Sequence, residues 1–268
     1  MISKEKTAYP IFYSSYSDKE LDSLFKITNQ ELHFVQSFSP KKKAQFIMMV
    51  LLKTHQYLGY FPQLENIPIE IINFIKKVYL LSSITKMDYT SRYLGMIKRQ
   101  IQQYLDVKPF SKNGEKELTL FVKECAYNMA DPTDLVNAGI SELLRNHYSL
   151  PSFDVLEKLV RSSRHQTHQD IYQHVFLKLS QDDQEQLNQL LIVPEDHFTT
   201  PFGKIKAYPN TAKFSNINEW KERLVWLNSL VDTTHLVKDI PFTKIKQFAT
   251  QSNVCLLYTS DAADDSLR

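Results

Sequence analysis

The sequence predicts an all-α protein built as a multi-helical array. Only 5 of its 268 residues are glycines, and they lie far apart, so the clustered glycines of a dinucleotide-binding turn or a P-loop are not present. No Asn-Gly or Asp-Gly pair joins two alternating apolar runs, as a tight β-hairpin requires. The hydrophobic fraction of 43% is ample for a packed core. These observations leave helices as the main element.

Capping residues and prolines mark where helices begin and end in the first part of the chain. Thr28 and Glu31 form a capping box, and Pro40 and Pro68 each precede an apolar pattern with helical spacing. Pro109 ends a helix, and the Lys-Asn-Gly sequence after it is typical of a turn. One predicted helix therefore begins after Thr28, and three others span residues 41–57, 68–80 and 89–106.

Further helices are predicted in the second part of the chain. Asp131 precedes Pro132 and caps one of them, and a Leu-Pro-Ser break at 150–152 precedes a long one. The middle of the long helix, 161–170, has no aliphatic or aromatic side chain, so we expect it to leave the core and cross solvent or a partner. Residues 195–214 contain prolines and are expected to form a linker. The predicted helices span residues 115–129, 132–148, 153–179, 180–193 and 216–231.

Neither a membrane nor an oxidising compartment is indicated. The first residues are charged and lack the apolar stretch of a secretory signal. The longest wholly apolar run, Phe46–Leu52, is 7 residues long, whereas a membrane span needs about 20. Cys125 and Cys255 form no CxxC pair and no zinc-ligand spacing. We therefore expect a cytoplasmic protein without disulfides.

The C-terminal residues have an unusual sequence. Cys255–Asp265 resembles the in-frame translation of a transposase adapter used to prepare sequencing libraries. We expect residues 255–268 to be an artefactual tail and the natural chain to have been cut near Val254. The tail holds three aspartates and one arginine, so excluding it raises the formal net charge from +2 to +4.

No active site is visible in the sequence. There is no GxSxG elbow, and Cys125 lies in an apolar stripe where a buried structural thiol is expected. His165 and His168 have the spacing of metal ligands, but no third ligand accompanies them. We predict no catalytic residue, no metal site, no cofactor and no small-molecule substrate in these residues.

Basic residues are concentrated on two predicted helices. Between Lys86 and Lys116 there are seven Lys and Arg residues against three acids, and phosphate contact depends on such local charge. The helices 68–80 and 89–106 fit a helix-turn-helix unit whose second helix reads DNA. A solvated basic face remains the alternative for this region. The candidate DNA-binding residues here are Arg92, Lys98, Arg99 and Gln102.

The long helix carries a second set of candidates. Lys158, Arg161, His165 and His168 are spaced three, four and three residues apart, which predicts one continuous polar stripe, and Arg164 lies among them. We expect that replacing Arg161 and Arg164 with alanine lowers DNA affinity without changing the melting temperature. A weaker set, for backbone phosphate, lies at the start of a helix and comprises Lys41, Lys42 and Lys43.

Three stretches carry a family resemblance. YLGYFPQLENIPIEIINFI (57–75), DYTSRYLGMIKRQIQQYLDVKPF (88–110) and LPSFDVLEKLVRSSRHQTHQDIYQHVFLKLSQDDQEQLNQLL (150–191) occur in that order. Together they resemble the N-terminal region of the replicative class II transposases, the Tn-three family. The resemblance implies binding to double-stranded DNA at the transposon's terminal inverted repeats. Ser91 and Lys98 depart from the family, because they stand in a stretch that is commonly rich in arginine.

The resemblance also implies what lies outside these residues. In this family a distant C-terminal domain with a DDE acidic triad and divalent metal cuts and joins DNA, so this chain is expected to have no catalytic activity of its own. It further implies a homodimer in the full-length enzyme and association with the nucleoid when DNA is bound. The predicted domains are a first helical DNA-binding domain (1–114), a second (115–194), a linker with the start of a dimerisation region (195–254), and the tail (255–268). The alternative is a helical scaffold that binds proteins and not DNA.

Overall fold

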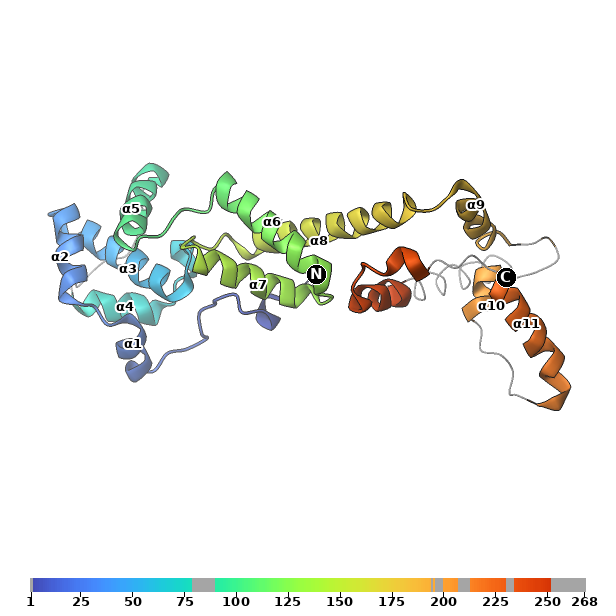
Figure 1. The fold of residues 1–268 in the computed structure, drawn as a ribbon. Coiled ribbons are helices and arrows are strands. Elements are labelled where there is room, and N and C mark those ends of the chain that lie inside the picture. Colours follow the sequence, from blue (N-terminus) through green and yellow to red (C-terminus); the bar gives the residue numbers. More distant parts are fainter. Residues whose placement is uncertain are drawn as a thin grey trace. The chain divides into compact units, whose positions relative to one another are not determined.

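The computed structural model describes residues 2–78, 90–193, 195, 200–206, 213–229 and 234–251 (Figure 1). Within these ranges the chain is helical and contains no strand, which confirms the all-α prediction. The single extended pairing there is an isolated bridge between Lys108 and Tyr148. The predicted adapter tail and residues 79–89, which include Lys86, lie outside the described residues.

The chain divides into two compact units. Unit 1 comprises Met1–Cys125 and Asp131–Arg164, and unit 2 comprises Ala126–Ala130 and His165–Arg268. This division follows compactness, so the predicted functional boundaries at 114, 194 and 254 stay predictions. None of the helices in the described part of the chain is long and apolar enough to cross a membrane.

The helices have the following bounds. The first part of the chain forms α1 (Asp18–Phe25), α2 (Asn29–Phe38), α3 (Lys42–Leu58), α4 (Ile69–Val78) and α5 (Ser91–Tyr104). The middle forms α6 (Lys112–Asn128), α7 (Pro132–Arg145) and α8 (Phe153–Phe176). The last part forms α9 (Gln181–Gln189), α10 (Pro201–Lys206) and α11 (Ile217–Ser229), and a further helix spans 242–251.

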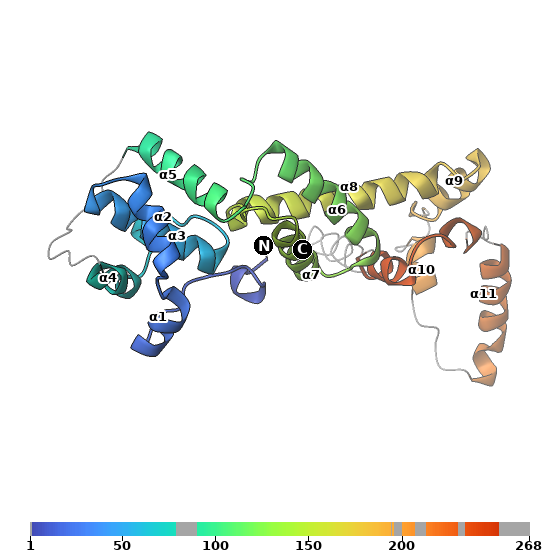
Figure 2. The same cartoon turned by 60° about the vertical axis from the view of Figure 1, so that its left-hand side comes forward.

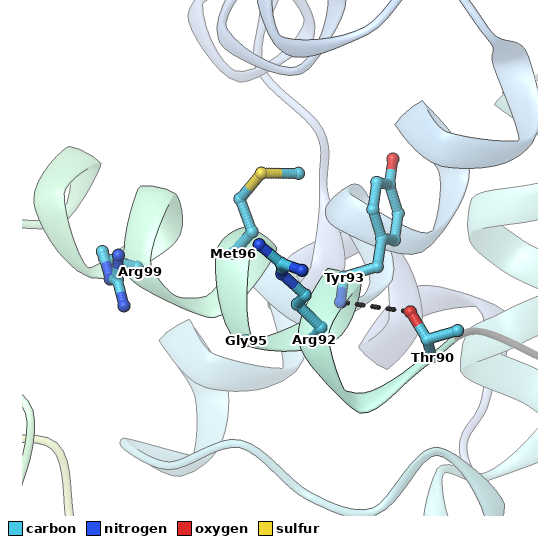
Figure 3. A pocket seen from close by; sticks show the side chains of 6 residues that line it. All are labelled: Thr90, Arg92, Tyr93, Gly95, Met96 and Arg99. Atoms are coloured by element: carbon cyan, nitrogen blue, oxygen red, sulfur yellow. Dashed lines mark hydrogen bonds between the residues drawn. The ribbon is translucent and has the colours of Figure 1, made fainter.

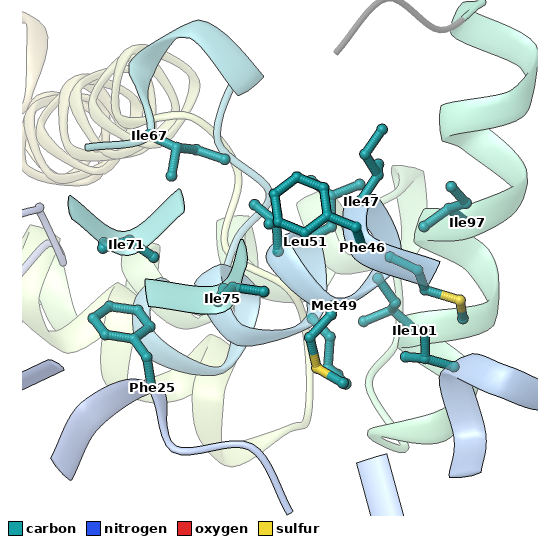
Figure 4. Packing of buried hydrophobic residues seen from close by; sticks show 14 of the residues in the cluster. Phe25, Phe46, Ile47, Met49, Leu51, Ile67, Ile71, Ile75, Ile97 and Ile101 are labelled. Atoms are coloured by element: carbon teal, nitrogen blue, oxygen red, sulfur yellow. The ribbon is translucent and has the colours of Figure 1, made fainter. Parts of the chain in front are cut away.

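Unit 1 is centred on α3, which α1, α2, α4 and α5 surround (Figures 1 and 2). The run Phe46–Leu52 is almost wholly buried, because a helix that is apolar on every side must be covered on every side. Figure 4 shows Phe25, Ile71, Ile75, Ile97 and Ile101 packed around this run. The core of unit 1 thus fixes the position of α5, whose inner face supplies Ile97 and Ile101.

A buried ion pair joins α2 to α3. Lys53 Nζ lies 3.0 Å from a Glu31 carboxylate oxygen, and both side chains are at most 7% exposed. Burial alone would raise the pKa of Glu31, but hydrogen bonds from the Thr28 N–H, Gln56 and Lys53 outweigh it and hold that pKa below its usual value. Thr28 and Glu31 also form the predicted capping box, which is confirmed. One acidic side chain therefore caps α2 and anchors it to α3.

The rest of unit 1 is formed by α6, α7 and the first half of α8. Their facing side chains are apolar and buried, among them Leu118, Val122, Leu135, Ile140, Leu156 and Val160. Gly59 ends α3 in the left-handed conformation with φ 72°, and its carbonyl accepts from Leu150 N–H at 2.8 Å. This hydrogen bond ties the end of α3 to the segment that precedes α8.

Two sequence predictions about local structure are wrong. Lys112–Gly114 is the first turn of α6 and not a turn between helices. A Cβ at Gly114 would lie 3.1 Å from the Tyr148 ring, so close packing accounts for the glycine. The middle of α8 does not simply cross solvent, because Ser163, Thr167 and His168 are at most 8% exposed. The apolar pattern missed this burial because the buried side chains are polar.

Elements without a strong apolar pattern were missed by the sequence prediction. Ser17 caps α1 and forms a capping box with Glu20. The segment predicted as a linker contains α10, Pro201–Lys206. In unit 2 the helix 242–251 places Lys244 at 0% exposure, where its Nζ donates to the carbonyl oxygen of Met129 at 2.6 Å. This contact spans 115 residues of sequence, which is why no local signal indicates it.

Candidate nucleic-acid interface

The outer face of α5 carries the first set of predicted DNA-binding residues. The Thr90 hydroxyl accepts from the Tyr93 N–H at 3.4 Å and caps the helix (Figure 3). Ile97 and Ile101, four residues apart, are fully buried and fix which face points inward. Arg92 and Arg99 are consequently exposed, seven residues apart on the outer face.

A hollow of about 630 Å³ lies along this outer face (Figure 3). None of its lining residues is acidic; they are Thr90, Arg92, Tyr93, Gly95, Met96 and Arg99. Neither Arg92 nor Arg99 forms an ion pair with any carboxylate in the part of the chain that the structure describes. Two guanidinium groups are thus available to an anion that enters this hollow.

A second hollow of about 640 Å³ continues from the first and shares Gly95 and Arg99 with it. Its cations are Lys98, Arg99 and Lys108, and Asp106 is its single acid. Lys98 Nζ lies 5.5 Å from the centre of the Phe61 ring, and Lys108 Nζ lies 5.1 Å from the centre of the Tyr148 ring. These cation–π contacts hold both ammonium groups near the hollow without neutralising their charge.

A seam of hydrogen bonds supports the second hollow. Lys108 N–H donates to the His147 carbonyl at 2.6 Å, and Ser149 N–H donates to the Lys108 carbonyl at 2.8 Å. Gln102 Nε2 donates to Ser149 Oγ at 3.1 Å, and His55 Nε2 lies 2.9 Å from the same oxygen. Burial lowers the pKa of His55 to about 4, so its ring is neutral at pH 7. The seam joins α5 to α3 and to the segment after α7.

The structure places Gln102 differently from a free surface side chain and brings Lys108 to the second hollow. Gln102 is half-buried, and one of its amide hydrogens is engaged by Ser149, so it is fixed in place and not a freely exposed side chain. Lys108 was not among the predicted contacts because it lies beyond the helix, in a segment with no helical spacing to align it. Its position depends on the bridge to Tyr148, which connects residues 40 apart in sequence.

Two of the three candidate basic residues of α8 in unit 1 are less available than those of α5. Lys158 is exposed, but Arg161 forms an ion pair with Glu157, one turn earlier. Arg164 is half-buried, and its Nε is buried without a hydrogen-bond partner among the described residues. The pKa of Asp131 is lowered, chiefly by hydrogen bonds from Thr133 and also by the charge of Arg164. Arg164 is thus partly buried within unit 1, and its charge acts on Asp131.

The two histidines of α8 belong to unit 2 and have different surroundings. His165 is exposed, whereas His168 is 8% exposed. The His168 ring packs edge-on against Phe248 at 5.0 Å between centres, and its Nε2 lies 3.5 Å from Lys244 Nζ. His168 therefore does not cross solvent as expected for the middle of this helix, because the helix 242–251 covers that side chain.

The weaker candidates Lys41, Lys42 and Lys43 are exposed at the start of α3. Lys41 occupies the N-cap position without a side-chain cap, and the first turn contains no acid. Lysines there oppose the helix dipole, so an anion would stabilise this end. No group of three His, Cys, Asp or Glu side chains in the described ranges could hold a metal ion.

Comparison with known protein families assigns the chain to one of them. The model of a family described as a domain of unknown function, DUF4158, matches residues 1–163. The match covers more than half of the chain, and the protein belongs to this family, whose domain is found in Tn-three family transposases. The matched range contains α5 and both hollows. No curated protein matches the chain.

Proposed function

We propose that this chain is the N-terminal DNA-binding region of a replicative class II transposase of the Tn-three family. In this proposal it recognises double-stranded DNA at the transposon's terminal inverted repeats. The observation that carries the proposal is the outer face of α5, where Arg92 and Arg99 are exposed without an ion-pair partner in the described residues. Membership of a family whose domain occurs in these transposases supports it.

The proposal gives the α5 residues distinct roles. Arg92 and Arg99 contact phosphates, because exposed guanidinium groups form charge-assisted hydrogen bonds with phosphate oxygens. Lys98 and Lys108 add positive charge from positions that aromatic rings hold. Gln103, exposed beside Gln102, supplies an amide for base edges. A helix-turn-helix formed by α4 and α5 stays a prediction, because their connection falls outside the described residues.

Strand cleavage and joining are not assigned to these residues. In this proposal the DDE triad and its divalent metal belong to a C-terminal domain of the full enzyme. Dimerisation of that enzyme and its association with the nucleoid are parts of the same proposal, and they rest on the family resemblance alone. The α5 face requires none of them in order to bind DNA.

A gel-shift experiment tests the proposal. The whole chain is titrated into a labelled duplex taken from the terminal inverted repeat next to its gene, and into a scrambled duplex of the same composition, each at two salt concentrations. We expect the repeat duplex to bind more tightly at both concentrations, since specific binding exceeds the electrostatic background. Equal weak binding to both duplexes would overturn recognition of the repeat.

The alternative of a protein-binding scaffold has one supporting observation. Several large apolar side chains of unit 2 are exposed, including Phe176, Leu177, Phe214 and Phe242. A contiguous exposed apolar surface is typical of a protein contact, whereas apolar side chains exposed singly are normal. Association through such a surface should hardly weaken as salt rises, whereas DNA binding through several phosphates should weaken steeply. The salt series in the gel-shift experiment therefore separates the two functions.

A further inference from the structure

Gly95 occupies an unexpected place in the middle of α5. The residue is exposed, and glycine in a helix interior destabilises the helix relative to alanine. A Cβ at this position would meet no atom of the described residues within 4 Å. By contrast, a Cβ at Gly114 or Gly139 would lie 3.1–3.2 Å from a packed side chain. Packing inside the described structure therefore explains those two glycines and not Gly95.

The residues around Gly95 indicate what could occupy the space left by its lack of a side chain. Gly95 lines both hollows, and Arg92 and Arg99 flank it three residues before and four residues after on the same face (Figure 3). The two arginines are about 10 Å apart along the helix axis. Met96, beside Gly95, is 45% exposed and offers an apolar surface. The glycine thus lies at the centre of a concave surface that carries positive charge on both sides.

We infer that one strand of duplex DNA crosses α5 at Gly95, with its phosphodiester backbone against the helix backbone. The inference rests on the proposed function and deepens it, because it states which part of the DNA meets which residue. Arg92 and Arg99 bind the phosphates on either side of the crossing, and Met96 contacts the sugar between them. Glycine permits this approach because any side chain at position 95 would hold the strand away from the helix.

Replacing Gly95 with alanine should raise the stability of the fold and weaken DNA binding. Alanine removes the helix penalty, so Gly95→Ala should raise the melting temperature by about 2–4 °C. The added methyl group of Gly95→Ala should weaken DNA binding by about threefold. The longer side chain of Gly95→Gln should weaken it by about tenfold or more, because it holds the DNA strand further from the helix. Both residues favour helix, so neither variant is expected to lose its fold.

The experiment measures binding of the whole chain to a fluorescein-labelled 30-bp duplex of mixed sequence by anisotropy, together with thermal unfolding. Leu120→Gln is the matched control, because Leu120 is 60% exposed on α6 and lines neither hollow. The inference predicts weaker binding by both Gly95 variants, raised stability for Gly95→Ala, and wild-type affinity for the control.

Three results would overturn the inference, and each can be told from the others. If the wild type binds the duplex and both Gly95 variants bind equally well, the crossing at Gly95 is wrong while the proposed function stands. If the wild type binds neither this duplex nor the terminal-repeat duplex even at low salt, the proposed function fails and the inference fails with it. A loss of affinity in Leu120→Gln as large as that in Gly95→Gln would also contradict it, since the effect would not be local.

Discussion

The outer face of α5 and the middle of α8 look alike in the sequence and differ in the structure. Both carry arginines at helical spacing, yet Arg92 and Arg99 on α5 have no ion-pair partner among the described residues. On α8, Arg161 is paired with Glu157, and Arg164 is half-buried near Asp131. A count of basic residues therefore does not show which of them can bind an anion; the neighbours on the folded surface decide.

Arg161 differs only slightly from the α5 arginines in its availability to a phosphate. An exposed ion pair within a helix is worth only about 0.3–0.5 kcal/mol, so a phosphate could replace Glu157 at small cost. Arg164 differs, because the residue is half-buried and its Nε is buried, so only part of the side chain faces solvent. We therefore expect α5 to dominate DNA affinity and α8 to contribute little.

The largest expected effect comes from removing both α5 arginines. Arg92→Ala combined with Arg99→Ala should weaken DNA binding by about 30–100-fold at low salt, because two phosphate contacts are lost. The melting temperature should stay within about 2 °C of the wild type, since both side chains are exposed. Fluorescence anisotropy and thermal unfolding provide the two measurements.

Arg145→Ala is the matched control for that variant. Arg145 lies on α7, is 72% exposed and is paired with Glu142, so it resembles an ordinary surface arginine. Its removal should change DNA affinity by less than about twofold. An equally large loss in Arg145→Ala would show that affinity follows total charge and not the α5 face.

The next effect concerns the seam that positions α5. The pKa of His55 is lowered by burial to about 4, so the folded state resists protonation while the unfolded state binds a proton near pH 6.5. The contribution of His55 to the free energy of unfolding is therefore fully present above about pH 6.5 and declines as the pH falls toward 4. Between pH 7 and pH 5 the loss should be about 2 kcal/mol.

Urea unfolding at the two pH values measures this loss. His55→Asn removes the titrating group, and its free energy of unfolding should change less between pH 7 and pH 5 than that of the wild type. If the wild type and His55→Asn lose the same stability over this range, His55 does not control the acid sensitivity of the seam.

The smallest expected effects separate the two α8 arginines. Arg161→Ala should change the free energy of unfolding by less than about 0.5 kcal/mol, and Arg164→Ala should lower it by about 1 kcal/mol because packing is lost. Each should weaken DNA binding by no more than about threefold. The structure thus revises the expectation that removing Arg164 leaves stability unchanged. A loss in DNA affinity as large as that of the α5 variant would instead make α8 the principal contact.

Local signals predicted much of the fold. The capping box of Thr28 and Glu31, and the prolines before α3 and α4, placed helix starts within one or two residues of their observed positions. Each of these signals acts through neighbouring backbone groups, so it can be read without knowing the tertiary structure. The face of α5 was also predicted, because its apolar spacing fixes which side is buried.

Contacts between distant residues could not be predicted in this way. The burial of His168 depends on Phe248 and Lys244, and the place of Lys108 depends on a bridge to Tyr148. The pairing of Arg161 with Glu157 is a different case, because their four-residue spacing was visible in the sequence.

The salt dependence of DNA binding tests the central claim most directly. Each phosphate contact contributes about 0.9 to the slope of log affinity against log salt concentration. The account predicts that the variant with both Arg92→Ala and Arg99→Ala has a slope shallower than that of the wild type by about two, while Arg145→Ala keeps the wild-type slope. An unchanged slope in the double variant would show that these two arginines do not contact phosphate, and it would contradict the account.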